Sequence, residues 1–272
     1  MLNQQVSFKG SRRNWTKRQV LFSCVLLGVT AFGQTPVDVA AEGEPEPAPA
    51  AMAPADQPGN PATRFLRDVG ADQKRIWTSP FHMTQRQFWT LAVPLVGGTV
   101  GLKSLDRRIS DSLPNTADQV LWSGRISRVG AGYGLGLGAG ITTLVGHATG
   151  NPGTTSMGRA GVEALANGLL VTYATKWVFW RERPDAPGGR GSLWSGGSSF
   201  PSGHTLSSFA VATAIAQNRK CPKWLAITLY GAATAVSLSR VSSRRHFASD
   251  IYFGAFSGIL IGRSVANAAE NR

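Results

Sequence analysis

Apolar residues recur at helical spacing through most of the chain from residue 64 onward. Apolar positions three and four apart, interrupted by Gly, Pro and Asn, indicate amphipathic helices. Alternating apolar runs bounded by turns, which would indicate strands, are scarce. The pattern predicts an all-α fold, a bundle of about six helices, over residues 85–103, 118–148, 157–181, 203–217, 223–240 and 246–267.

One glycine-rich stretch is ambiguous in this pattern. Glycine occupies every second position from Gly130 to Gly140. Such a stretch is compatible with a loop, with a strand, or with a helix whose small residues allow a neighbouring helix to approach closely. We favour the helix.

The N-terminal 63 residues differ from the rest of the chain. A basic region ends at Arg18, an apolar run covers residues 20–32, and small residues follow, which is typical of a signal peptide over residues 1–33. The run is shorter than the roughly 20 residues of a membrane span, although an uncleaved anchor is the alternative. Residues 34–63 are rich in Pro, Ala and Glu and predict a disordered linker.

The net charge of the chain indicates which kinds of molecule it binds. The chain has 28 Lys and Arg against 15 Asp and Glu, a net charge of +13. A basic body favours anionic partners, namely phosphorylated substrates or an acidic membrane surface. No nucleic-acid-binding module is recognisable, so a nucleic-acid partner is not expected.

A first candidate cluster ends the helix predicted over residues 157–181. Lys176 and Arg183 are seven residues apart, which places both cations on one helix face, and Pro184 then stops the helix. Taken alone, cations at this position are as well explained by the helix dipole and by solvent.

A second cluster opens the next predicted helix. Pro201-Ser202-Gly203-His204 places a hydroxyl, an unshielded backbone N–H and an imidazole at a positive helix end. Such an end binds phosphate well, and a serine-capped helix with an incidental histidine is the alternative.

A third cluster comprises Ser239-Arg240, His246 and Asp250. His246 and Asp250 are four residues apart, so on a helix they are neighbours. A carboxylate bonded to one imidazole nitrogen leaves the other nitrogen free to attack. A helix-surface pair of marginal value is the alternative for these two residues alone.

In this order, the three clusters resemble the signature of the type 2 phosphatidic acid phosphatase superfamily, which also contains bacterial nonspecific acid phosphatases and vanadium haloperoxidases. The resemblance covers residues 157–267 as a catalytic core, with residues 64–156 as the N-terminal helices of the bundle. It implies an active site at one end of the bundle and a metal-independent phosphatase acting on a phosphomonoester or a lipid phosphate or diphosphate.

The resemblance also implies residue roles. His246 would attack phosphorus and form a phosphohistidine, and Asp250 would hold its tautomer. His204 would protonate the leaving oxygen and then activate water. The remaining signature residues would bind phosphate: Lys176, Arg183, Ser202, Gly203 and Arg240.

The implied enzyme needs no cofactor. Three cations around two histidines would repel a metal ion, so no metal site is expected. Vanadate could bind in place of phosphate, which leaves a vanadate-dependent haloperoxidase as an alternative function. A non-catalytic envelope protein that binds anionic lipid is a second alternative.

The signal peptide implies export. The predicted apolar segments are short for membrane spans, and six spanning helices would place Lys176 and Arg183 in the cytoplasm. The sequence therefore favours a periplasmic protein, or one peripheral to the membrane, with an integral inner-membrane protein as the alternative.

Overall fold

The computed structural model describes residues 60–114 and 116–272. The predicted signal peptide and all but the last four residues of the predicted linker lie outside the described residues. Within the described ranges the secondary structure is helical, without strands, which confirms the all-α prediction.

The described helices follow one another with short connections, apart from the loop of residues 180–202. Their bounds are α1 Pro61–Thr78, α2 Gln85–Gln87, α3 Val93–Ser112, α4 Ala117–Val129, α5 Gly132–Ala148, α6 Pro152–Phe179, α7 Gly203–Ala216, α8 Lys223–Ser242 and α9 Ala248–Glu270. A 3₁₀ turn covers Ser79–His82, and a π-helical turn, Phe88–Ala92, joins α2 to α3 without a break.

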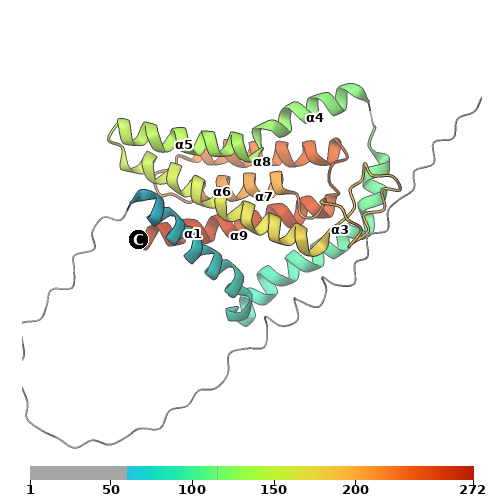
Figure 1. Cartoon of the computed structure of the whole chain (residues 1–272), viewed down its shortest axis with the longest axis horizontal. Helices are drawn as coiled ribbons and strands as arrows, with labels where there is room; N and C mark the ends of the chain where they lie inside the picture. Colours follow the sequence, from blue (N-terminus) through green and yellow to red (C-terminus); the bar gives the residue numbers. More distant parts are fainter. Residues whose placement is uncertain (1–59, 115) are drawn as a thin grey trace, which may run out of the picture. The chain divides into compact units, whose positions relative to one another are not determined.

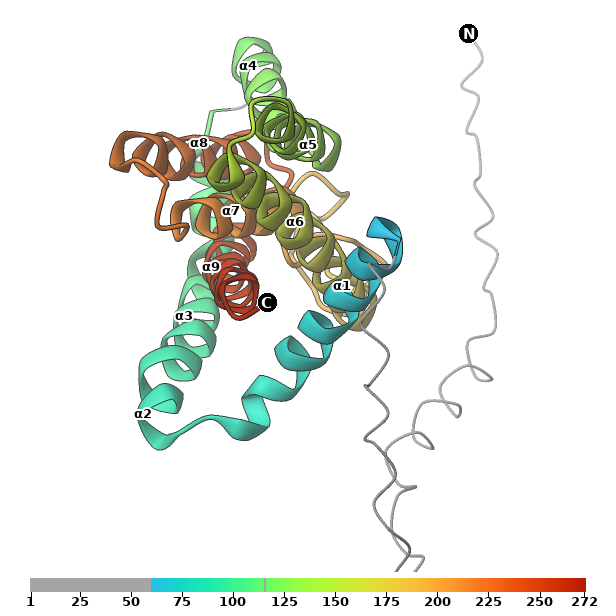
Figure 2. The ribbon, with the colours of Figure 1, turned by 90° about the vertical axis from the view of Figure 1, so that its left-hand side faces the viewer.

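Helix α7 is the centre of the bundle. It packs against α6, α8 and α9, as the view along the bundle in Figure 2 shows. The most buried apolar side chains lie along these contacts, including Leu206, Ala210 and Val265. Helix α3 covers α9, and α4 and α5 cover α8 and α6 respectively.

The described helices differ from the predicted ones in two respects and agree with them in a third. Residues 118–148 form two helices rather than one, because the chain turns at Gly130 and Ala131 between α4 and α5. The glycine-rich stretch from Gly132 onward is helical, as we favoured. Helix α1 was not predicted; Asn60 caps it through the N–H of Ala62, and Pro61 occupies its first turn, where proline is well tolerated.

Close packing of α9 on α7 depends on small residues one turn apart. A Cβ added at Gly254 would lie 3.0 Å from the carbonyl oxygen of Ser202, and one at Gly258 would clash with the carbonyl oxygen of Leu206. The two backbones therefore approach closely. This packing brings the first turn of α9 against the start of α7, where the Ser202 N–H donates to the carbonyl oxygen of Asp250 at 3.2 Å.

Several helices turn apolar faces outward. Among the described residues, Gln85–Ser112 and Ala117–Ala148 are long and apolar enough to cross a membrane, and the apolar part of the first is not buried inside the protein. Exposed apolar side chains recur at helical spacing on α3, α5 and α8: Val93, Val96, Val100, Leu137, Ile141, Leu144, Trp224 and Ile227. Exposed apolar helix faces of this kind suggest association with a membrane.

Candidate active site

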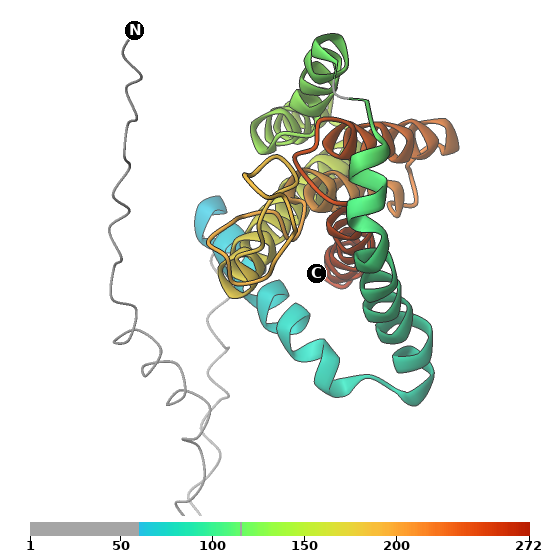
Figure 3. The same cartoon turned by 90° about the vertical axis from the view of Figure 1, so that its right-hand side faces the viewer.

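The predicted site residues come from four helix ends that meet at one end of the bundle. Lys176 lies near the end of α6 and Arg240 near the end of α8, whereas His204 begins α7 and Asp250 lies in the first turn of α9. Figure 1 shows these four ends together beside the loop of residues 180–202, and Figure 3 looks onto that end. The antiparallel order of α6 to α9 therefore brings together residues up to 74 positions apart in the chain.

His246 is buried in the loop between α8 and α9, with 3% of its surface exposed. Its Nδ1 lies 2.7 Å from the carbonyl oxygen of Ser199. A carbonyl oxygen only accepts hydrogen bonds, so Nδ1 carries the proton and Nε2 keeps its lone pair. Burial lowers the pKa of His246 to about 4, against the opposing effect of Asp250. The imidazole is therefore neutral near pH 7, with Nε2 available as a nucleophile.

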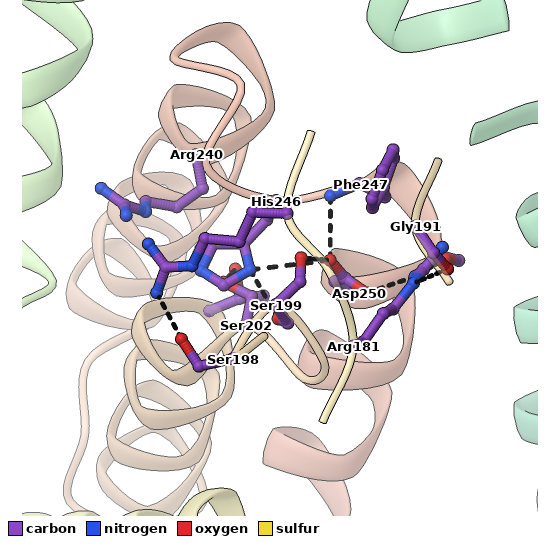
Figure 4. A network of polar contacts seen from close by, with 12 residues as sticks. Arg181, Gly191, Ser198, Ser199, Ser202, Arg240, His246, Phe247 and Asp250 are labelled. Carbon is purple, nitrogen blue, oxygen red and sulfur yellow. Dashed lines mark hydrogen bonds and ion pairs between the residues drawn. The ribbon is translucent and has the colours of Figure 1, made fainter. Parts of the chain in front are cut away.

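Asp250 lies on the Nδ1 side of the His246 ring, at a distance too long for a direct hydrogen bond. Its Oδ2 is 3.6 Å from His246 Nδ1, and the same oxygen accepts from Ser199 Oγ at 2.5 Å and from the Phe247 N–H at 2.9 Å (Figure 4). Burial would raise the pKa of Asp250, but the contact with His246 and the charge of Arg181 bring the pKa below its usual value. The group is thus an anion that favours positive charge on His246.

The second imidazole, His204, is half-buried at the start of α7. Burial, and after it the electrostatic effects of Arg240, His246, Lys176 and Arg183 in that order, together lower its pKa to about 4. These contributions show that the two imidazoles and the three cations share one electrostatic environment. A bound phosphate dianion would oppose the cations and favour the protonated imidazole.

The three cations offer hydrogen-bond donors to an anion. Arg240 Nε is buried and has no hydrogen-bond partner among the described residues, and burial lowers the pKa of Arg240 to about 10. Lys176 Nζ donates to the carbonyl oxygen of Ser198, and Arg183 Nη2 donates to Ser198 Oγ at 3.0 Å. Burial, followed by the charge of Arg183, lowers the pKa of Lys176 to about 8.

The start of α7 leaves a hydroxyl uncommitted. Ser202 is the N-cap residue, but its side chain makes no capping hydrogen bond, and its Oγ accepts from Thr205 Oγ1 at 3.0 Å. The Ser202 hydroxyl proton and the N–H of Gly203 are thus placed at a positive helix end, as a phosphate cradle requires.

A pocket of about 440 Å³ lies beside Arg183. Its lining also includes Ser198, Glu182, Asp185 and Gly197. A larger cavity of about 960 Å³ lies at the opposite end of the bundle and is lined by none of the predicted site residues. Of these two, the smaller pocket is the one that shares a residue, Arg183, with the candidate site.

The sequence interpretation missed four residues that surround Asp250. Arg181 and Ser199 contact it from the loop of residues 180–202. Ser249 precedes it on α9, and Asp106 on α3 contacts Arg181 and Ser249 rather than Asp250 itself. Arg181 lies between the signature residues Lys176 and Arg183, so its position in the sequence could have identified it as a candidate site residue. Asp106 is 75 residues from Arg181 and carries no local signal.

Comparison with known proteins agrees with the signature. Residues 160–272 match the sequence model of the PAP2 superfamily. The chain is 37% identical over 101 residues to a lipid A 1-phosphatase of Porphyromonas gingivalis. The aligned segment covers 36% of this chain and 20% of that protein. The chain therefore spans about a fifth of the length of this curated relative.

A solved structure is also similar. It is a transmembrane PAP2-type phosphatidylglycerolphosphate phosphatase from Bacillus subtilis, with 22% sequence identity and a TM-score of 0.48, over 77% of this chain and 94% of that one. The match over residues 160–272, independent of this structure, confirms the resemblance of that part of the chain to the PAP2 superfamily.

Proposed function

We propose that this chain, whose residues 160–272 match the PAP2 superfamily, hydrolyses a phosphate ester, most readily that of a lipid, through a phosphohistidine intermediate. The observation that carries the proposal is the state of His246. It is a buried, neutral imidazole with Nδ1 committed to Ser199, and it shares its surroundings with His204 and three cations.

In the first step His246 Nε2 attacks phosphorus. The bond from phosphorus to the leaving alcohol oxygen breaks, and the protonated His204 gives that oxygen its proton. Lys176, Arg183 and Arg240 hold the oxygens over which negative charge spreads, so most of the rate enhancement comes from fixed positive charge. Asp250 stabilises the positive charge that develops on His246.

In the second step the phosphohistidine is hydrolysed. His204, now neutral, takes a proton from water, whose oxygen attacks phosphorus as the bond to His246 Nε2 breaks. Inorganic phosphate leaves and the neutral His246 is restored. Neither step requires a metal ion, since the cations supply the positive charge that a metal would otherwise provide.

A lipid substrate is supported by two observations. The relative of Porphyromonas gingivalis is named for a lipid substrate, and the described helices include apolar segments suited to a membrane. We place Gln85–Ser112 and Ala117–Ala148 in the bilayer, because their exposed apolar side chains would otherwise face water. The pocket beside Arg183 then receives the polar part of the leaving group.

The test is phosphate release by the detergent-solubilised full chain in the presence of EDTA. Small monoesters, phosphatidate, phosphatidylglycerophosphate and a polyprenyl diphosphate are compared as substrates. We expect lipid phosphates to be hydrolysed and His246→Ala to lose activity at least about a thousandfold. His147→Ala, at the opposite end of the bundle, is the matched control and retains activity.

Two results would overturn the proposal: no phosphate release from any ester, or full activity in His246→Ala. Brief incubation with a ³²P-labelled substrate followed by alkaline quenching is expected to label the wild-type protein and not His246→Ala. Bromide oxidation dependent on vanadate and peroxide would instead favour the haloperoxidase.

A further inference from the structure

Arg181 is a buried cation between two carboxylates from distant helices. It has 2% of its surface exposed, as has Asp106, and Asp250 is fully buried. Arg181 Nη2 contacts Asp106 Oδ2 at 2.6 Å. Arg181 Nη1 contacts Asp250 Oδ1, and both of these residues are labelled in Figure 4. Its Nε donates to the carbonyl oxygen of Gly191 at 3.2 Å, and its guanidinium lies 4.4 Å from the ring centroid of Phe247.

The backbone at the end of α6 aims Arg181 inward. Trp180 adopts a left-handed conformation, with φ of 40°, and ends the helix. The chain then reverses, so that Arg181 points back into the bundle while Arg183, two residues on, lies in the site. A left-handed non-glycine residue is costly and is found where the surrounding structure enforces it.

The contacts of Arg181 fix both groups that face His246 Nδ1. The side chain takes Oδ1 of Asp250 and so leaves Oδ2 toward His246 and Ser199. The backbone carbonyl oxygen of Arg181 accepts from the Ser199 N–H at 2.9 Å, and the Ser199 carbonyl is the acceptor for His246 Nδ1. One residue therefore orients the carboxylate and the carbonyl that set the tautomer of the nucleophile.

Asp106 in turn fixes Arg181 and the start of α9. Its Oδ1 accepts from the Ser249 N–H at 2.9 Å, while Oδ2 accepts from Arg181 and from Ser249 Oγ. Without Asp106, the Arg181 guanidinium would retain one carboxylate partner rather than two, and Nη2 would lose the acceptor that Asp106 provides. Asp106 lies on α3, outside the residues that match the superfamily.

We propose that Asp106 and Arg181 are positioning residues for the nucleophile, acting through Asp250 and Ser199 on the tautomer and orientation of His246. This inference rests on the proposed function. It extends the active site to α3, one of the two segments we place in the membrane, so that the packing of α3 on α9 is coupled to catalysis.

The central variant is Asp106→Asn, compared with the wild type in the detergent-solubilised full chain. Asparagine keeps an oxygen acceptor of the same shape and removes the charge that balances Arg181. We expect kcat to fall at least about tenfold, as for outer-shell partners of ligating histidines, with KM little changed. Ser249→Ala removes one hydrogen bond from Asp106 and one from Arg181 while keeping every charge, and we expect a smaller loss of kcat in the same direction.

A structural role alone would not change the tautomer of His246 in folded protein. With ¹⁵N-labelled histidine, we expect the wild type to show Nδ1 protonated and Nε2 unprotonated, and Asp106→Asn to show a mixture of both tautomers. The matched control is Asp72→Asn, which alters a carboxylate equally buried and paired with Arg75 and Arg272 at the opposite end of the bundle. We expect it to lower the melting temperature without changing kcat of the folded protein.

A double-mutant cycle separates action through Asp250 from an independent effect. If Asp106 acts through Asp250, then Asp106→Asn has little further effect in the Asp250→Asn background. Unchanged kcat and tautomer in both Asp106→Asn and Ser249→Ala, or additive losses in the cycle, would refute the inference. Should Asp106→Asn not fold, Ser249→Ala alone decides it. The wild-type and His246→Ala rates test the proposed function separately, so the two failures are distinguishable.

Discussion

Arg240→Met tests how the site stabilises negative charge. Arg240 lies near the end of α8, and its buried Nε has no hydrogen-bond partner among the described residues. A bound phosphoryl group would supply one. Methionine fills a similar volume and removes the charge and the donors. Loss of one fixed donor to the transition state typically lowers kcat by about 10²–10³, or about 2.7–4 kcal/mol, and we expect a loss in this range.

The same substitution has a second, independent consequence at His204. Burial is the largest cause of the low pKa of His204, and Arg240 is the largest contribution from a charge. Removing that charge makes the imidazolium easier to form, so the pKa of His204 rises from about 4 toward its ordinary value of 6.5. The general acid is then more protonated at neutral pH, so the loss of kcat cannot be ascribed to a missing proton.

The assay combines phosphate release with an NMR titration of ¹⁵N-labelled histidine in the full chain, with His204→Gln used to assign the resonance. Arg219→Met is the matched control, because Arg219 is 90% exposed and lies between α7 and α8 at the opposite end of the bundle. We expect wild-type kcat and an unchanged His204 titration in this control. A kcat for Arg240→Met within about threefold of the wild type, with an unchanged pKa of His204, would refute our account of the site.

Three further predictions concern pH, packing and inhibition. The pKa of Lys176 is lowered to about 8, so Lys176 loses its charge as the pH rises through that value; kcat/KM for an anionic substrate should fall there, and Lys176→Arg should remove this part of the profile. Gly258→Val should lower the free energy of unfolding by about 1–3 kcal/mol in chemical denaturation, because the valine side chain would clash with the carbonyl oxygen of Leu206. Gly231→Val, at a position on α8 with open space around it, is the control for the change in helix propensity. Vanadate should inhibit phosphate release competitively, and noncompetitive inhibition or none would argue against a shared anion site.

The helices were predictable because their signals are local. Apolar spacing and breakers are read over one or two turns, and they indicated α3 and α6–α9 to within a few residues, apart from the C-terminal half of α3. The break at Gly130 and Ala131 was missed because glycine is compatible with both a helix and a turn. Helix α1 was also missed, although it is strongly amphipathic, with charged residues such as Arg64, Arg67 and Asp68 segregated from its apolar face.

The sequence by itself determined the chemistry of the site. The three clusters contain two imidazoles, three cations and a carboxylate, and their spacing assigns them to helix ends or to the loops beside those ends. Only the tertiary structure decided what lies behind His246. The acceptor for its Nδ1 is a backbone carbonyl, at Ser199, which no side-chain motif encodes. Arg181 and Asp106 meet across 75 residues because α3 packs on α9. Contacts between separate helices depend on how those helices pack, and local periodicity does not contain that information.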